Sequence, residues 1–333
     1  MSPKLSVLDL SPVSSGMTAA QALHNTLDLA RHADRLGFHR CWLAEHHNMP
    51  GIAGSSPEIL IGQVARETSK MRVGSGGVML PNHAPLQVAE RFQTLEALFP
   101  GRIDLGIGRA PGSDPRTASA LRRAGQTEEL PAQLADLFGF AGGQFPAGHP
   151  LGSVAAVPFG VRLPPVWLLG SSDYSAQVAA ALGLGFAFAH HINPSGAEEA
   201  MRLYRNNFTP SEALPEPEAL VTASVICADT DAEAEKLAAS FDLAWLRLYA
   251  GRPSVFPSPE EARTYPYSAA ERAQVQATRS RLILGSPQTV RAKLCALAGR
   301  VGAGEIMATT FVHDHEARKH SYTLLAEAFG SAG

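Results

Sequence analysis

Short apolar runs alternate with longer amphipathic segments along most of this chain. Runs flanked by glycine or proline are typical of strands, and apolar residues at helical spacing predict helices. The expected strands span residues 5–10, 40–44, 72–78, 103–107, 166–169, 186–189, 220–227 and 305–310. The expected helices span residues 19–36, 57–69, 85–99, 173–182, 195–208, 232–249 and 316–329. We expect an α/β fold, a (β/α)8 TIM barrel, and not an open doubly wound sheet, because no Gly-x-Gly-x-x-Gly turn follows the first strand.

Two insertions interrupt this alternation, one after the fourth expected strand and one after the seventh. Residues 139–165 are rich in glycine and proline, and residues 250–284 contain several prolines before a helical stretch. Insertions of this length in a compact domain are more often lids or binding loops than linkers. The sequence shows no internal repeat and no second domain, so we expect a single barrel domain over residues 1–333.

The composition limits the classes of partner. The 333 residues are 45% hydrophobic with a net charge of -3 and no basic stripe, so we expect a small-molecule ligand and neither nucleic acid nor a membrane surface. The chain has no apolar run of about 18 residues, and its amino terminus lacks the features of a signal peptide. We therefore expect a cytoplasmic protein. The three cysteines are far apart and form no Cys-x-x-Cys pair, which disfavours both disulfides and a thiolate zinc site.

Acid and base groups follow the second expected strand directly. The run Ala44-Glu45-His46-His47-Asn48 stands behind Cys41-Trp42-Leu43, where a barrel strand delivers its side chains into a site. The same cluster is also compatible with a metal fragment or a hydrogen-bonded loop. His190 and His191 end the sixth strand and are expected at the same end of the barrel. His313, His315 and His320 lack the spacing of a metal pair on one helix face, so we expect no metal site.

Two further segments have the composition of a ligand site. The glycines of Gly74-Ser75-Gly76-Gly77 end the third strand, where they indicate either a bulge or a backbone against which a flat ligand lies. Arg109, after the fourth strand, is either a phosphate ligand or a solvated loop arginine. Ser171, Ser172 and Ser175 open a helix, where hydroxyls and free amides favour an anion, although one of them also suits the N-cap.

Four segments together resemble one family. They are WLAEHHN at 42–48, MRVGSGGVMLPNHAPLQVAERFQTLEALFPGRIDLGIGRAPG at 71–112, VWLLGSSDYSAQVAAALGLGFAFAHH at 166–191 and GSPQTVRAKL at 285–294. The chain resembles the bacterial luciferase-like flavin monooxygenases, in particular the single-component luciferase-like monooxygenase branch. The resemblance covers nearly the whole length and is most specific over 71–112.

The resemblance implies a cofactor, a reaction and roles for individual residues. Reduced FMN, supplied by a separate NAD(P)H:flavin reductase, reacts in such enzymes with O2 to a C4a-(hydro)peroxide that oxidises a small organic substrate. His46 matches the catalytic histidine, which transfers a proton, while Glu45 and His47 are expected to hold the loop. Gly76-Gly77 matches a step, often a non-proline cis peptide, on which the isoalloxazine ring rests.

The phosphate site follows from the same resemblance. Arg109 matches the phosphate-binding arginine of the family, and Ser171, Ser172, Ser175 and His190 complete the expected cofactor-binding set. Luciferase itself carries an acidic residue at or near the position of Ser171, so the phosphate contacts here are expected to be redistributed.

Two other functions remain open from the sequence, a coenzyme F420-dependent hydride-transfer oxidoreductase and a non-catalytic flavin-binding relative. The identity of the organic substrate does not follow from these residues, because the conformation of the two insertions that would select it cannot be inferred from their composition. The family also pairs its subunits through the helices that match 57–69 and 85–99, so we expect a homodimer.

Overall fold

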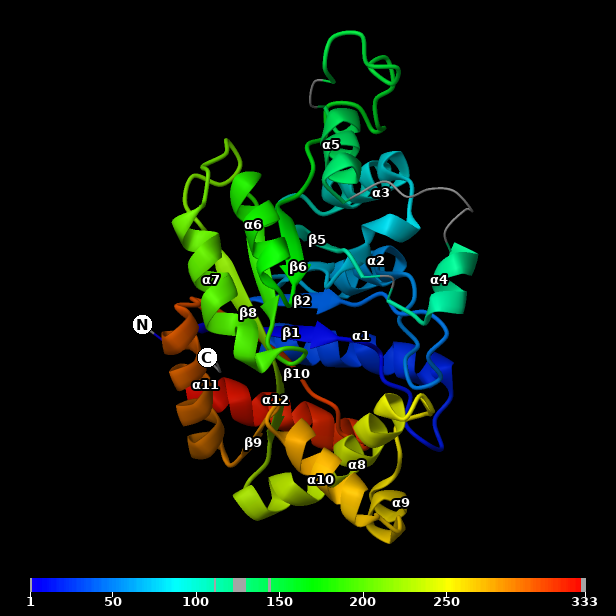
Figure 1. Cartoon of the computed structure of the whole chain (residues 1–333), viewed down its shortest axis with the longest axis vertical. Helices are drawn as coiled ribbons and strands as arrows, with labels where there is room; N and C mark the ends of the chain where they lie inside the picture. Colours follow the sequence, from blue (N-terminus) through cyan, green and yellow to red (C-terminus); the bar gives the residue numbers. More distant parts are fainter. Residues whose placement is uncertain (1, 111, 122–129, 143–144, 331–333) are drawn as a thin grey trace.

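Parallel strands close into a barrel in the computed structural model, which describes residues 2–110, 112–121, 130–142 and 145–330 (Figure 1). The barrel strands are β1 (Lys4–Asp9), β2 (Arg40–Leu43), β3 (Arg72–Ser75), β5 (Ile103–Gly108), β6 (Val166–Gly170), β7 (Gly185–Ala189), β8 (Ala219–Cys227) and β10 (Glu305–Thr309). Each pairs with the next in this order, and β10 closes the barrel by pairing with both β8 and β1. The predicted (β/α)8 TIM barrel is confirmed.

Two short strands extend the sheet. The predicted strand 72–78 is interrupted after β3 and resumes as β4 (Val78–Met79), which pairs with β5. β9 (Leu282–Gly285), which the sequence pattern did not predict, continues the sheet beside the carboxyl end of β8.

A layer of helices surrounds the barrel. These helices are α1 (Ala19–Arg35), α2 (Pro57–Glu67), α3 (Pro85–Leu98), α5 (Leu130–Phe140), α6 (Asp173–Ala181), α7 (Ala197–Asn206), α11 (Pro287–Val301) and α12 (His315–Phe329). Their inner faces and the outward faces of the strands form the main apolar core. Thr18 caps α1 in a capping box, which explains why that helix starts where the pattern predicted. No described helix is long and apolar enough to cross a membrane.

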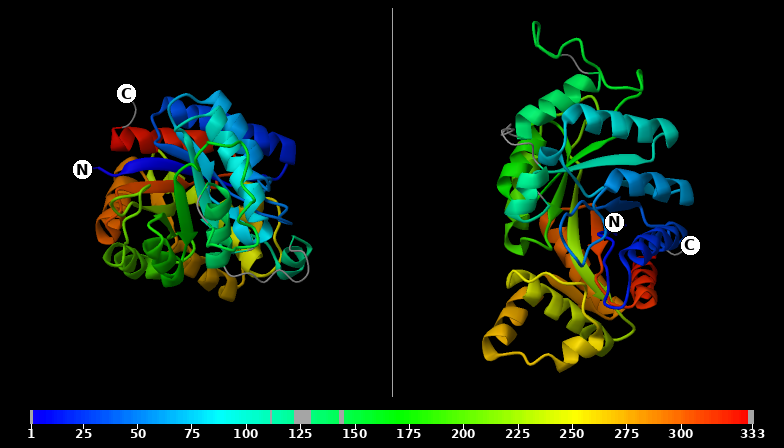
Figure 2. Two further views of the ribbon diagram at one scale, coloured as in Figure 1. Left: turned by 90° about the horizontal axis from the view of Figure 1, so that it is seen from above. Right: turned by 90° about the vertical axis from the view of Figure 1, so that its right-hand side faces the viewer.

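The remaining helices belong to the excursions between barrel units. α4 (Pro115–Leu121) follows β5, and the described residues after α5, 141–142 and 145–165, form irregular backbone, much as predicted for 139–165. α9 (Pro259–Thr264) and α10 (Ala269–Arg279) both pack on α8 (Asp231–Tyr249), and Figure 2 shows the three helices gathered on one side of the barrel. The assignment of 232–249 as the helix of the seventh unit is therefore wrong. α11 takes that place, because it packs against α7, α12 and β8.

A buried polar network fills the amino end of the barrel. The Arg40 guanidinium bonds Asp104 at 2.9 Å and Glu305 at 2.7 Å, and it lies 4.7 Å from the centre of the Trp167 ring. Trp42 Nε1 also donates to Asp104, at 3.0 Å. Above this network Leu8, Trp42 and Met307 form an apolar floor, and the carboxyl end of the barrel lies beyond them.

Candidate active site

A cavity of about 460 Å³ opens over this floor, at the carboxyl ends of the strands. Six of the predicted site residues line it together: His46, Gly76, Arg109, Ser171, Ser172 and Ser175. Gly77 and His190 are not among its lining residues. Among the described residues, the charged and titratable groups that line the cavity are Arg109, Arg281, His46, His191 and the phenol of Tyr249. None of the described lining residues is acidic. A cavity with two fixed cations and no carboxylate favours anionic ligands.

His46 follows β2 and continues the alternation of side-chain directions that begins in this strand. Trp42, Ala44 and His46 face the cavity, so the intervening Glu45 points away from it. The His46 backbone amide donates to the Gly54 carbonyl at 2.9 Å, whereas its buried Nδ1 has no hydrogen-bond partner among the described residues. Burial lowers the pKa of His46 to about 4. The charge of Glu45 acts to raise this pKa, and the charge of His47 acts to lower it. The imidazole is therefore neutral at pH 7, with a ring nitrogen free for a ligand or a proton.

Glu45 holds the surrounding loops in place. Its buried carboxylate accepts hydrogen bonds from His47 Nε2 at 2.9 Å, His83 Nε2 at 3.0 Å and the Met79 backbone amide at 2.8 Å. Burial raises the pKa of Glu45, but the bonds from His83, His47 and Met79 outweigh it and leave the pKa below its ordinary value. Glu45 and His47 thus hold loop geometry, as expected, and the cluster has the character of a positioning network.

The glycine step forms a side-chain-free part of the wall. The Gly76–Gly77 peptide bond is cis, as the family resemblance implied. Gly76 lines the cavity, while a Cβ on Gly77 would lie 2.8 Å from the Gly106 carbonyl oxygen. Gly77 is thus a glycine because the backbone of β5 passes too close for a side chain, and its role is to shape the wall without touching the cavity.

Polar donors gather at the start of α6. Ser172 occupies the N-cap position with extended backbone, and its hydroxyl makes no capping hydrogen bond. Ser171 is fixed through its carbonyl, which accepts from Asn193 Nδ2 at 2.9 Å, and Ser175 is buried on the first turn. Arg109 lies exposed at the rim, with its guanidinium 4.5 Å from the centre of the Tyr174 ring. These groups, together with the positive end of α6, form a donor set that suits an anionic group such as a phosphate.

The two histidines at the end of β7 face opposite sides. Ala187, Ala189 and His191 line the cavity, whereas His190 is 6% exposed and its pKa is lowered by burial and by the charge of Arg300. His190, predicted as a cofactor-binding residue, therefore does not line the cavity, whereas His191 does. Burial lowers the pKa of His191 to about 4. A hydrogen bond to the Thr222 carbonyl acts to raise this pKa, whereas the charges of His190, His46 and Arg281 lower it further.

Sequence reasoning missed the wall that α8 and the following segment form. Ala244, Trp245 and Leu248 line the cavity from α8, and Trp245 stacks on Phe241 with ring centres 4.2 Å apart. Phe241, Ala244, Trp245 and Leu248 follow the spacing i, i+3, i+4, i+7, which was a readable signal of a buried face. Tyr249, Phe256 and Arg281 complete this side.

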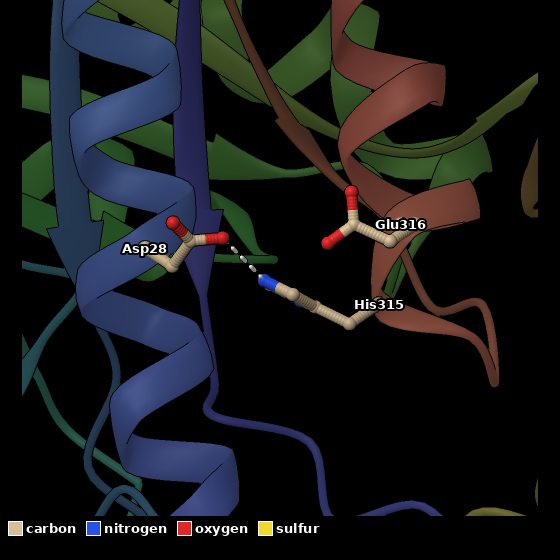
Figure 3. Close-up of side chains that lie close together, drawn as sticks. All are labelled: Asp28, His315 and Glu316. Atoms are coloured by element: carbon tan, nitrogen blue, oxygen red, sulfur yellow. Dashed lines mark hydrogen bonds and ion pairs between the residues drawn. The ribbon is translucent and has the colours of Figure 1, made fainter.

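The histidines after β10 bond to separate partners away from the cavity. His313 contacts Ser15 at 3.0 Å, and His320 contacts Asp229 at 3.1 Å. Figure 3 shows His315 of α12 pointing to Asp28 of α1, with Glu316 beside them. The distance from His315 Nε2 to Asp28 Oδ2 is 3.0 Å. Lys319 Nζ lies 2.8 Å from both carboxylates, so an ammonium already supplies the positive charge of this group.

The barrel, the glycine step and the donor set define the class of protein. Residues 4–304 match the family of luciferase-like monooxygenases, and the chain belongs to this family. A luciferase-like monooxygenase of Escherichia coli (strain K12) is 46% identical over 96% of this chain and 95% of that protein. The N-acetyl-S-alkylcysteine monooxygenase of Bacillus subtilis (strain 168) is 37% identical over 98% of each chain. The crystal structure of apo-MsnO8 is 40% identical and superposes with a TM-score of 0.90, covering 99% of this chain and 98% of that one.

More distant structures share the fold. The oxygenating constituent of 3,6-diketocamphane monooxygenase from Pseudomonas putida, in complex with FMN, has a TM-score of 0.72 at 19% identity, covering 98% of this chain and 97% of that one. An F420-dependent secondary alcohol dehydrogenase has a TM-score of 0.67 at 13% identity, covering 99% of each chain. The same barrel thus serves two kinds of cofactor.

Proposed function

We propose that this protein is an FMN-dependent monooxygenase that uses reduced FMN and O2 to oxidise a small organic substrate. The observation that carries the proposal is the arrangement within one cavity of a side-chain-free wall at Gly76, the partnerless Nδ1 of His46 and a cation, Arg109, beside the open start of α6. These features fit a flat ring at the centre of the cavity and a phosphate at its rim.

The phosphate end of FMN fits the polar rim. Arg109 has a cation–π contact but no ion pair with a described carboxylate, so its guanidinium is available for a phosphate. The hydroxyls of Ser172 and Ser175 and the first amides of α6 would add uncharged donors there. His191 stands further inside, where it would contact the ring or the substrate.

The chemistry divides between the cofactor and the chain. Reduced FMN, when bound, supplies the electrons that activate O2. His46 would exchange a proton at Nδ1, and its low pKa leaves the imidazole unprotonated at neutral pH. The apolar walls from β1, β2 and α8 would exclude water from the reacting atoms. We further propose, on the family resemblance, that a separate NAD(P)H:flavin reductase delivers the reduced FMN.

A direct binding and turnover experiment tests this function. The protein is titrated anaerobically with reduced FMN, riboflavin and F420, and O2 consumption is then followed with each reduced cofactor. The proposal expects FMN to bind most tightly and the bound reduced FMN to consume O2. Tight F420 binding without O2 consumption would establish the hydride-transfer alternative, and FMN binding without any effect on the oxygen reaction would indicate a non-catalytic flavin-binding protein.

A further inference from the structure

Arg281 is a second cation that lines the cavity, in addition to Arg109. It lies between α10 and β9 and lines the cavity on the side of α8. Its guanidinium donates a hydrogen bond to the Tyr249 hydroxyl and lies 5.6 Å from the centre of that ring. No ion pair joins it to a carboxylate of the described chain.

The two other partly buried arginines of the same excursion differ in this respect, whereas its remaining arginines are exposed. Arg247 pairs with Glu261 at 2.7 Å, and Arg279, two residues before Arg281, pairs with Asp242 at 2.6 Å. Both are partly buried, as Arg281 is, and both have their charge balanced within the chain. A partly buried guanidinium with only a neutral phenol as partner retains most of its capacity to bind an anion.

The two cavity arginines stand on different sides of the barrel. Arg109 follows β5, whereas Leu282, the neighbour of Arg281, pairs with Ser224 of β8, and β6 and β7 separate β5 from β8. The apolar side chains of Trp245, Leu248 and Phe256 line the same cavity. One phosphate at the start of α6 would therefore use Arg109 and leave Arg281 to a different group.

We propose that the substrate carries an anionic group, such as a carboxylate, which Arg281 binds while the apolar part of the substrate lies against α8. This inference rests on the proposed function, because it assigns the FMN phosphate to Arg109. It makes Arg281 the residue that selects acids over neutral molecules of the same shape. Tyr249 positions the guanidinium by accepting its hydrogen bond.

A pair of probes that differ in charge tests the assignment. Octanoate and octanamide are titrated by calorimetry into the protein saturated with oxidised FMN. Wild type should bind octanoate about tenfold or more tightly than octanamide, which is the usual size of a charge-assisted contact. Arg281→Met should abolish this preference, and Arg281→Lys should retain part of it because the charge remains. Arg263→Met, on the exposed surface of α9 and outside the cavity, is the matched control and should behave as wild type.

The outcomes separate this inference from the proposed function. Failure of wild type to bind FMN would defeat the proposed function itself. If FMN binds but octanoate and octanamide bind equally, the function stands and the role of Arg281 is wrong. If Arg281→Met instead weakens FMN relative to riboflavin, Arg281 is a phosphate ligand and the inference is also wrong. Should Arg281→Met lose its folded melting transition, Arg281→Gln repeats the measurement, and in wild type the octanoate preference should weaken with added KCl.

Discussion

The Glu45 carboxylate accepts a hydrogen bond from the backbone amide of Met79 at 2.8 Å. This bond ties the loop after β2, which carries His46, to the backbone that follows the Gly76–Gly77 step. The two parts of the proposed flavin site are therefore held together by a group that does not itself line the cavity.

Replacing Glu45 should damage both stability and cofactor binding. Glu45→Ala leaves the imidazole of His83 and the amide of Met79 without their buried acceptor, so we expect the free energy of unfolding to fall by about 3 kcal/mol or more. FMN affinity should fall as well, because the glycine step loses its support. Denaturant unfolding and FMN titration measure the two effects. Glu45→Gln, which keeps one acceptor oxygen, should lose less, and equal stability of Glu45→Ala and wild type would show that the network is not needed.

Arg109 should account for the preference for FMN over riboflavin. Arg109→Ala removes a charge-assisted contact typically worth about 1.5 to 3 kcal/mol, or roughly ten- to more than a hundredfold in affinity. Fluorescence titration of the two flavins gives the ratio directly. Arg116→Ala, on the exposed face of α4, is the control and should keep the wild-type ratio. Equal binding of FMN and riboflavin by wild type would refute the phosphate site.

We propose that the chain forms a homodimer through α2 and α3. Most apolar residues of these helices, such as Val64 and Phe92, are buried against the barrel, but Ile59 and Leu98 are each 66% exposed. The double variant Ile59→Lys, Leu98→Lys should therefore be monomeric by light scattering at micromolar concentration, because it places charge in an apolar interface. Leu182→Lys, at an exposed leucine beyond α6, should leave the mass unchanged. A monomeric wild type would contradict the proposal.

Stability should decline in mildly acidic solution. Burial lowers the pKa of His46 and of His191 from 6.5 to about 4, so between these pH values the unfolded chain binds more protons than the folded protein. The melting temperature should therefore be highest above pH 6.5 and fall as the pH drops toward 4. His46→Gln removes one of the two groups and should make the decline shallower. An identical pH profile in the variant would show that His46 is not held neutral by the fold.

The barrel was predictable because each strand and helix is a local pattern. The cis peptide bond at Gly76–Gly77 was also predictable, through the resemblance over 71–112. The sequence also contained enough information to choose His191 and not His190 as the residue that lines the cavity. In the run from Phe186 to His191 the bulky Phe186 and Phe188 pack outward, so the alternation of the strand places Ala187, Ala189 and His191 inside.

The second excursion was not predictable in the same way. Residues 232–249 form a helix as expected, but only contacts with distant segments show that α11 packs on the barrel and α8 covers the cavity. Arg281 has no local feature that marks it as a cavity residue. Its position depends on the pairing of β9 with β8, two segments that lie far apart in the sequence.

If His46 acts in oxygen chemistry at a bound flavin, its removal should lower turnover without weakening flavin binding. Wild type and His46→Ala are loaded anaerobically with reduced FMN, mixed with O2, and followed by flavin absorbance and by turnover in the presence of a reductase. We expect nearly equal FMN affinity and a turnover lower in the variant by about 10²- to 10⁴-fold, the range of a positioned acid/base group. A variant that keeps wild-type turnover, or a wild type in which bound reduced FMN reoxidises like free flavin, would contradict the account.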